Sequence, residues 1–294
     1  MTSPSSPARH QTGTDKLLVD VADAVAVVTL NNPAKRNALS SDMRAALQVL
    51  LEALQADDRV RVVVLTGAGD KAFASGADIS EFADRRTSPE ARAEYDRAGE
   101  ALNRSWTVLD KPLIAMIRGF CIGGGLFTAL QADIRVAADD SQFGVPAARL
   151  GLGPGMFGVT TLIGLIGPAQ TSEMLFSARR FSAPEALAMG LVNRVVPASA
   201  LREETMALAQ AIAANAPLTV AASMTFVSGF HCTSNVCCDG TNPVANTGFA
   251  PFGDSETAGA PLEATGMADP GLAAGSTLAS VAAVAFVPDA EVEA

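Results

Sequence analysis

The chain has no lysine or arginine after Arg202. All 21 basic residues lie at or before that position, so the net charge of −10 is carried entirely by residues 203–294. Proteins that bind nucleic acid need clustered lysine and arginine to neutralise phosphates. This charge distribution therefore predicts no nucleic-acid partner. Such a complete loss of basic residues is more than a domain boundary normally brings.

Long apolar runs are also missing. The most apolar stretch, residues 278–287, is interrupted by Ser280, whereas a membrane-spanning helix needs roughly 20 apolar residues. Residues 1–14 are polar and lack the apolar core of a secretory signal. We therefore expect a cytoplasmic protein without membrane contact and without disulfides, and a disordered tail over residues 1–14.

Cysteine is scarce and unevenly placed. Cys121 stands alone in the first part of the chain, and we interpret it as a small buried hydrophobe rather than a nucleophile. The other three cysteines crowd into seven residues, and a metal cluster could be drawn from His231, Cys232, Cys237, Cys238 and Asp239. The paired spacing of zinc ligands is missing there, so we predict no metal site.

The apolar periodicity predicts a mixed α/β domain. Strands are expected within residues 16–30 and at 62–66, 113–117 and 134–137. Helices are expected at 40–56, 89–109 and 201–213, and from Gly125, Pro168 and Pro184. The recurring order of strand, strand and helix is typical of sheets covered by helices. We place the folded core at residues 15–228. Residues 229–294 are rich in glycine, proline, serine, threonine and asparagine, and we predict that they are disordered.

Two glycine-rich segments carry chemical meaning. Residues 72–79 (AFASGADI) follow one expected strand, and residues 117–125 (IRGFCIGGG) join another strand to a helix. Small residues let a ligand approach the backbone, and free N–H groups at a helix N-terminus favour a partly negative oxygen. Two such groups converging on one oxygen would form an oxyanion hole. The alternative is that both segments merely allow tight packing. Their occurrence together, each after a strand, favours a ligand site.

Several further motifs occur in register with these two segments. They read DIRVAA, SQFGVP, LGLGPG and FSAPEALAMGLVNRVVP. Over residues 15–222 the chain resembles the crotonase (enoyl-CoA hydratase/isomerase) superfamily. The resemblance implies a spiral of ββα turns assembled as trimers or hexamers. It also implies that the backbone amides of Ala77 and Gly124 bind the carbonyl of an acyl-CoA thioester and stabilise its enolate.

The resemblance also assigns a CoA site, with no cofactor beyond the CoA part of the substrate. Arg36 and Ala38 match the loop that contacts the nucleotide end of CoA, and a cation there suits its phosphates. A solvated basic pair in a turn is the alternative for Arg36. The other expected contacts lie beside the two donors, at Ser75, Gly76, Asp78, Ile79 and Gly123. Asp78 could instead be structural and cap a helix N-terminus.

The chain departs from this family at its acid/base positions. Phe127 and Ala147 occupy the places of the two glutamates that activate water in hydratases, and neither can transfer a proton. Residues 153–158, where some relatives place an acid, contain no titratable group. The resemblance also stops after Val220. With the loss of basic residues, this suggests a shifted reading frame or a replaced terminus.

Three hypotheses follow. The chain is an enzyme that uses only the oxyanion hole, a non-catalytic acyl-CoA binder, or a structural protein with a decayed terminus. The intact glycine-rich segments argue against the third hypothesis. Phe127 and Ala147 argue against hydration but not against CoA binding. The acyl group, the reaction and the oligomeric state stay open at this point.

Overall fold

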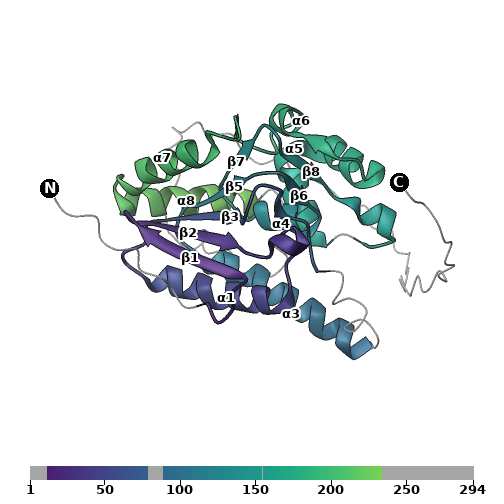
Figure 1. Ribbon diagram of the computed structural model, residues 1–294, viewed down its shortest axis with the longest axis horizontal. Helices are drawn as coiled ribbons and strands as arrows, with labels where there is room; N and C mark the ends of the chain where they lie inside the picture. The colour runs from purple at the N-terminus through teal and green to yellow at the C-terminus, as the bar shows by residue number, and fades with distance from the viewer. Residues whose placement is uncertain (1–11, 79–88, 154, 234–294) are drawn as a thin grey trace, which may run out of the picture. The chain divides into compact units, whose positions relative to one another are not determined.

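The large sheet contains six strands in the part of the chain that the structure, a computed structural model, describes, namely residues 12–78, 89–153 and 155–233. Its order is β1-β2-β3-β5-β7-β10. Only β1 and β2 are antiparallel, and every other neighbouring pair is parallel. The bounds are β1 Leu17–Ala22, β2 Val25–Leu30, β3 Val62–Gly67, β5 Leu113–Ile117, β7 Ile134–Ala138 and β10 Arg194–Val196. Figure 1 labels β1, β2, β3, β5 and β7 of this sheet, which lie side by side.

A second, four-stranded sheet is built from very short strands. Its order is β4-β6-β8-β9, with the first three parallel and β9 antiparallel to β8. The bounds are β4 Ala72–Ala74, β6 Phe120–Ile122, β8 Gln142–Gly144 and β9 Phe181–Ser182. Along the chain, a strand of the large sheet is followed by one of the small sheet three times: β3 by β4, β5 by β6 and β7 by β8. The chain therefore winds through both sheets once per turn, and the predicted mixed α/β fold is confirmed.

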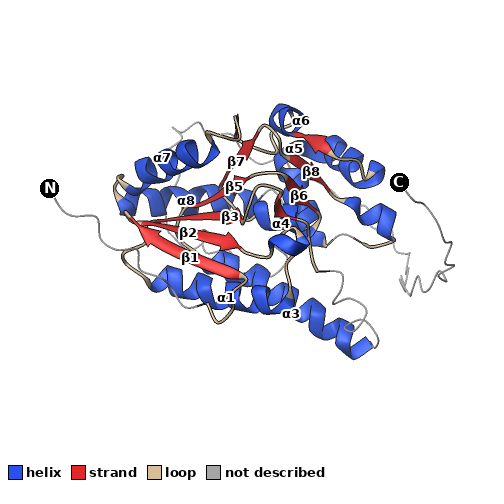
Figure 2. Ribbon diagram, viewed as in Figure 1, coloured by secondary structure: helices blue, strands red, loops and turns tan. Residues whose placement is uncertain are grey.

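Helices cover both faces of the large sheet (Figure 2). Helices α1 and α3 pack against each other on one face, and α7 lies against β2, β3, β5 and β7 on the other. The bounds are α1 Ser41–Ala56, α3 Pro89–Val108, α4 Gly124–Ala129, α5 Met156–Ser177, α6 Ala183–Ala188, α7 Leu201–Ala213 and α8 Pro217–Thr233. Short 3-10 helices occur at Pro33–Lys35 and Pro146–Leu150.

Alternation along the central strands produces two separate apolar clusters. In β3, Val63 and Leu65 face the cluster that contains α1, whereas Val62 and Val64 face the cluster under α7. Successive side chains of a strand point to opposite faces, so a wholly apolar strand fits a sheet buried on both sides. This burial explains why residues 62–66 read as an uninterrupted apolar run.

The element predictions are mostly confirmed, with corrections at three helix starts. Helix α4 begins at Gly124 and α6 begins at Ala183, each one residue earlier than expected. Pro168 does follow a break, since Gly167 has non-helical angles (φ 74°, ψ 166°), but helical residues already precede it from Met156. The strands of the small sheet and β10 of the large sheet were missed because two or three residues are too few for a periodic pattern.

The end of the described chain is helical. Helix α8 continues to Thr233, five residues beyond the boundary drawn at residue 228. Three of its large apolar side chains are exposed, Leu218 at 87%, Phe226 at 66% and Val227 at 56%. Of the two regions predicted to be disordered, only residues 12–14 and 229–233 belong to the described part of the chain. The rest of both regions lies outside it. Among the described helices, no single one could span a membrane by length and composition. Helices α7 and α8 meet that criterion only as a pair bent by 107°.

Candidate functional site

The two glycine-rich segments meet in the folded chain. A Cβ atom placed on Gly124 would lie 3.3 Å from the amide nitrogen of Ala77, and one placed on Gly76 would lie 3.4 Å from the amide nitrogen of Gly124. From standard backbone dimensions, the nitrogens of Ala77 and Gly124 are then within about 6 Å of each other. Segments 47 residues apart in the sequence thus present two amides to one place.

Both amides are available to a ligand. Gly124 is the first residue of α4, where a helix leaves its N–H groups without intrahelical partners. Ala77 forms a parallel bridge with Leu39, but the bonds of that bridge are made by the neighbouring residues Gly76 and Asp78. Within the described residues, neither amide donates a hydrogen bond to the protein. The arrangement can therefore accept one oxygen atom between two donors.

The loop before α1 holds the first glycine-rich segment in place. The amide of Ser75 donates to the carbonyl oxygen of Arg36 (3.0 Å), and the Ser75 hydroxyl donates to that of Lys35 (3.1 Å). The Lys35 ammonium donates to Asp78 Oδ2 at 2.7 Å, and the Asp78 carboxylate is nearly buried. Ser75, an expected CoA contact, is half-buried and bonded to this loop.

Asn37 attaches the loop before α1 to the chain around β4 through its side-chain amide. It is buried and adopts a left-handed conformation (φ 55°), which asparagine tolerates better than most residues. Its side-chain amide donates to the carbonyl oxygens of Ala68 (2.9 Å) and Ala72 (2.7 Å). Ala38, an expected CoA contact, is 6% exposed and its carbonyl accepts a bond from Asn32. Its amide also donates to the Lys35 carbonyl at 3.0 Å, so both polar groups of its backbone already have partners.

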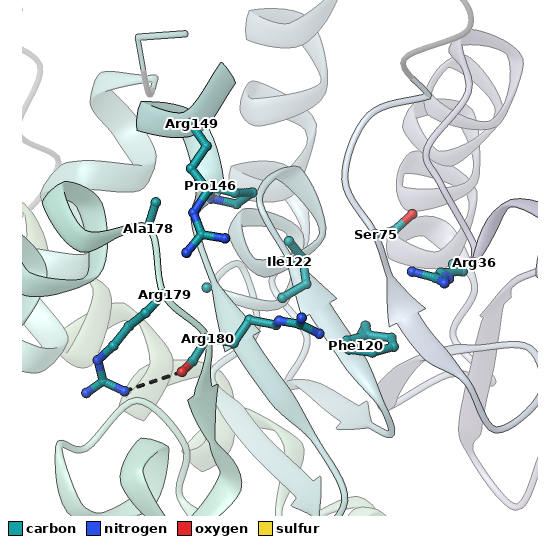
Figure 3. Close-up of a pocket in the computed structure, with 10 residues that line it drawn as sticks. Arg36, Ser75, Phe120, Ile122, Pro146, Arg149, Ala178, Arg179 and Arg180 are labelled. Carbon is teal, nitrogen blue, oxygen red and sulfur yellow. Dashed lines mark hydrogen bonds between the residues drawn. The ribbon is translucent and has the colours of Figure 1, made fainter. Parts of the chain in front are cut away.

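A pocket of about 290 Å³ borders the two segments. Figure 3 shows Ser75 and Arg36 on one side, three arginines on the other, and Phe120 and Ile122 between them. Ser75 directly precedes Gly76 and Ala77, and Ile122 directly precedes Gly123 and Gly124. The pocket is lined by Arg36, Ser75, Phe120, Ile122, Gly144, Pro146, Arg149, Ala178, Arg179 and Arg180. None of these described lining residues is acidic.

The arginines of the pocket differ in their partners. Arg179 is neutralised by Glu173 (2.7 Å) and Glu185 (2.8 Å). Arg36 and Arg180 approach the ring of Phe120 from two sides, at 5.4 and 5.5 Å from its centroid. These distances are within the range of cation–π attraction. Contact with the ring does not neutralise the two guanidinium groups, so both charges can still attract an anion.

The two expected acid/base positions are apolar and filled. Phe127 and Ala147 are partly buried and pack against the main apolar cluster. The ring of Phe127 lies on Gly158 of α5, where an added Cβ would fall 2.5 Å from Phe127 Cε1 and 2.8 Å from Cγ. A side chain at residue 158 would collide with the ring. The absence of a side chain there is a signal in the sequence that could have shown how Phe127 is accommodated.

Several other predictions can be placed. Cys121 is fully buried, and burial raises the pKa of its thiol, which confirms it as a small buried hydrophobe. Gly123 is the N-cap of α4, and its positive φ of 56° suits glycine. Ile79 lies outside the described residues, as does any helix that Asp78 could cap. The described side chains contain no group of three or more potential metal ligands, and the candidate cluster around residues 231–239 lies beyond them.

Comparison with known proteins identifies the family. The sequence model of the Enoyl-CoA hydratase/isomerase family matches residues 20–230. The chain therefore belongs to this acyl-CoA-processing family, and the crotonase resemblance is confirmed.

Individual relatives agree with this assignment. The chain is 37% identical over 219 residues to the short-chain-enoyl-CoA hydratase of Clostridium acetobutylicum, covering 74% of this chain and 83% of that protein. It is 39% identical over 195 residues to the carnitinyl-CoA dehydratase of Salmonella typhi, covering 66% and 73%. The crystal structure of an enoyl-CoA hydratase/carnithine racemase from Magnetospirillum magneticum superposes with a TM-score of 0.73 at 36% identity, covering 78% and 84%.

Proposed function

We propose that this chain binds acyl-CoA thioesters, holding the thioester carbonyl between the amides of Ala77 and Gly124. The observation that carries the proposal is the convergence of these two unbonded amides. A carbonyl oxygen placed there gains negative charge when the α-carbon loses a proton. Two fixed donors bind that charge more strongly than they bind the neutral ester, and so they stabilise the enolate.

The neighbouring pocket suits the rest of the CoA molecule. Coenzyme A carries phosphate groups, and guanidinium groups pair well with phosphate oxygens. Arg36 on one side of the pocket and Arg149 and Arg180 on the other could each reach such a group. Phe120 and Ile122 give the floor an apolar surface for the uncharged pantetheine arm. We assign no cofactor beyond CoA itself.

Hydration of an enoyl-CoA is not part of the proposal. Adding water across a double bond requires groups that activate the water and deliver a proton, each worth about 10²–10⁴ in rate. The described lining of the pocket contains no carboxylate, and Phe127 and Ala147 replace the two expected acids. We therefore expect binding without hydratase turnover.

A second candidate function is a non-catalytic acyl-CoA binder. The packing of Phe127 against Gly158 favours it, because the ring fills a position where an acid or base would act. The two functions differ in one measurable property. A protein that stabilises the enolate accelerates exchange of the α-protons of a bound acyl-CoA with solvent, whereas a pure binder does not.

The test combines three measurements on the full chain. Calorimetric titration with butyryl-CoA and with S-butyl-CoA, which lacks the carbonyl oxygen, should show tighter binding of the thioester. Hydration of crotonyl-CoA, followed by absorbance, should stay at the background rate. Mass spectrometry of butyryl-CoA in D₂O then separates the two candidates. Robust hydration, or equal affinity for thioester and thioether, would contradict the proposed use of the site.

A further inference from the structure

We infer that the Lys35–Asp78 ion pair is a positioning device for the Ala77 donor. This inference rests on the proposed function, because it concerns how one of the two carbonyl-binding amides is held. Asp78 is the residue directly after Ala77, and its carboxylate binds Lys35 at 2.7 Å. The pair therefore acts one residue away from the N–H group that would contact substrate.

The backbone on both sides of Ala77 is tied to the same loop. Gly76 accepts a bond from the Leu39 amide at 2.8 Å, and the Asp78 amide donates to the Leu39 carbonyl at 3.2 Å. These two bonds fix the distance between the segments. Before Ala77, the segment is held in addition by Ser75, which donates to the carbonyl oxygens of Lys35 and Arg36.

The ion pair adds a side-chain attachment on the other side of Ala77, beside the backbone bond from Asp78 to Leu39. Lys35 lies four residues before Leu39, in a turn whose carbonyls also bind Ser75. The Lys35–Asp78 contact links the part of the turn four residues before Leu39 to the side chain of the residue that follows Ala77. Two attachments at separate points determine the orientation of the peptide, whereas one determines only its position. The direction of the Ala77 N–H then depends on both.

Burial makes the pair more than a surface contact. The Asp78 side chain is 7% exposed while that of Lys35 is 50% exposed. A carboxylate in such surroundings is costly to leave without a cation, whereas the half-exposed lysine can be replaced without opening the core. Exposed ion pairs contribute little, and the chain offers one for comparison. Lys16 binds Asp42 at 3.1 Å, with side chains 38% and 48% exposed.

The test compares the affinities of butyryl-CoA and S-butyl-CoA, whose ratio measures the carbonyl contact alone. In Lys35→Met and Asp78→Asn, the preference for the thioester should fall about threefold or more, the size expected when one hydrogen bond is misdirected. In Lys35→Met, affinity for the thioether should stay within about twofold. The matched control Lys16→Met should change neither value. Thermal unfolding of each variant shows whether it is folded.

The outcomes separate this inference from the function on which it rests. If the wild-type chain shows no preference for the thioester, the carbonyl site itself is wrong. If the wild-type chain shows the preference and folded Lys35→Met retains it, the site stands and the positioning role is refuted. An equal loss of affinity for both ligands also refutes it, because a general structural effect does not distinguish a carbonyl from a methylene group.

Discussion

Substituting Gly124 with alanine should remove carbonyl binding while leaving the fold intact. The added Cβ would lie 3.3 Å from the Ala77 nitrogen and 3.5 Å from the Gly76 Cα atom. An oxygen that accepts a hydrogen bond from that nitrogen must itself sit about 2.9 Å away. The methyl group and the oxygen would therefore compete for the gap between the two donors.

The expected magnitudes follow from this geometry. Each hydrogen bond contributes about 0.5–1.5 kcal/mol net, so losing both lowers affinity for a thioester by about tenfold or more. Stability should change by less than about 1 kcal/mol, because alanine favours the first turn of α4 and this offsets the tight contacts. Gly153→Ala is a suitable control, since a Cβ there meets no atom within 4 Å.

The assay is calorimetric titration of Gly124→Ala with butyryl-CoA and S-butyl-CoA, beside a thermal unfolding scan. The reasoning requires a selective loss of thioester affinity in a protein that unfolds near the wild-type temperature. Wild-type affinity for the thioester would refute it, since the methyl group would then not occupy the carbonyl position.

Two further predictions concern stability. Gly125→Ala should lower the midpoint of thermal unfolding by about 5 °C or more, because its Cβ would collide with the carbonyl oxygen of Ala74 and lie 2.6 Å from the carbonyl carbon; an unchanged midpoint would show that β4 shifts freely. Glu185→Ala should destabilise the chain at neutral pH. The pKa of Glu185 is lowered from 4.5 to about 2 by the Ser182 amide, then by its hydroxyl and by Arg179. A lowered pKa stabilises the fold above the unfolded value, so the difference from wild type should vanish between pH 4.5 and about 2 in unfolding scans. A difference that is constant with pH would contradict this assignment.

Much of the fold and part of the site could be predicted from the sequence. The central strands β2, β3 and β5 are mostly apolar runs of five or six residues, and α7 has the bounds that its periodicity indicates. Such patterns depend on burial alone, which neighbouring residues share. The family motifs likewise pointed to Ala77 and Gly124 of the candidate site. Two backbone segments can approach each other closely only where their residues are small, and such residues form a recognisable sequence motif.

The remaining features were decided by tertiary structure. Nothing in the local sequence around Lys35 or Asp78 indicates their ion pair, because the two residues lie 43 positions apart and meet only in the folded chain. The contact between the Phe127 ring and Gly158 depends in the same way on how α4 and α5 pack. Periodicity records which face of an element is buried, whereas a contact between loops depends on where the chain returns. Only the folded chain shows which side chains hold the two amides at the candidate site.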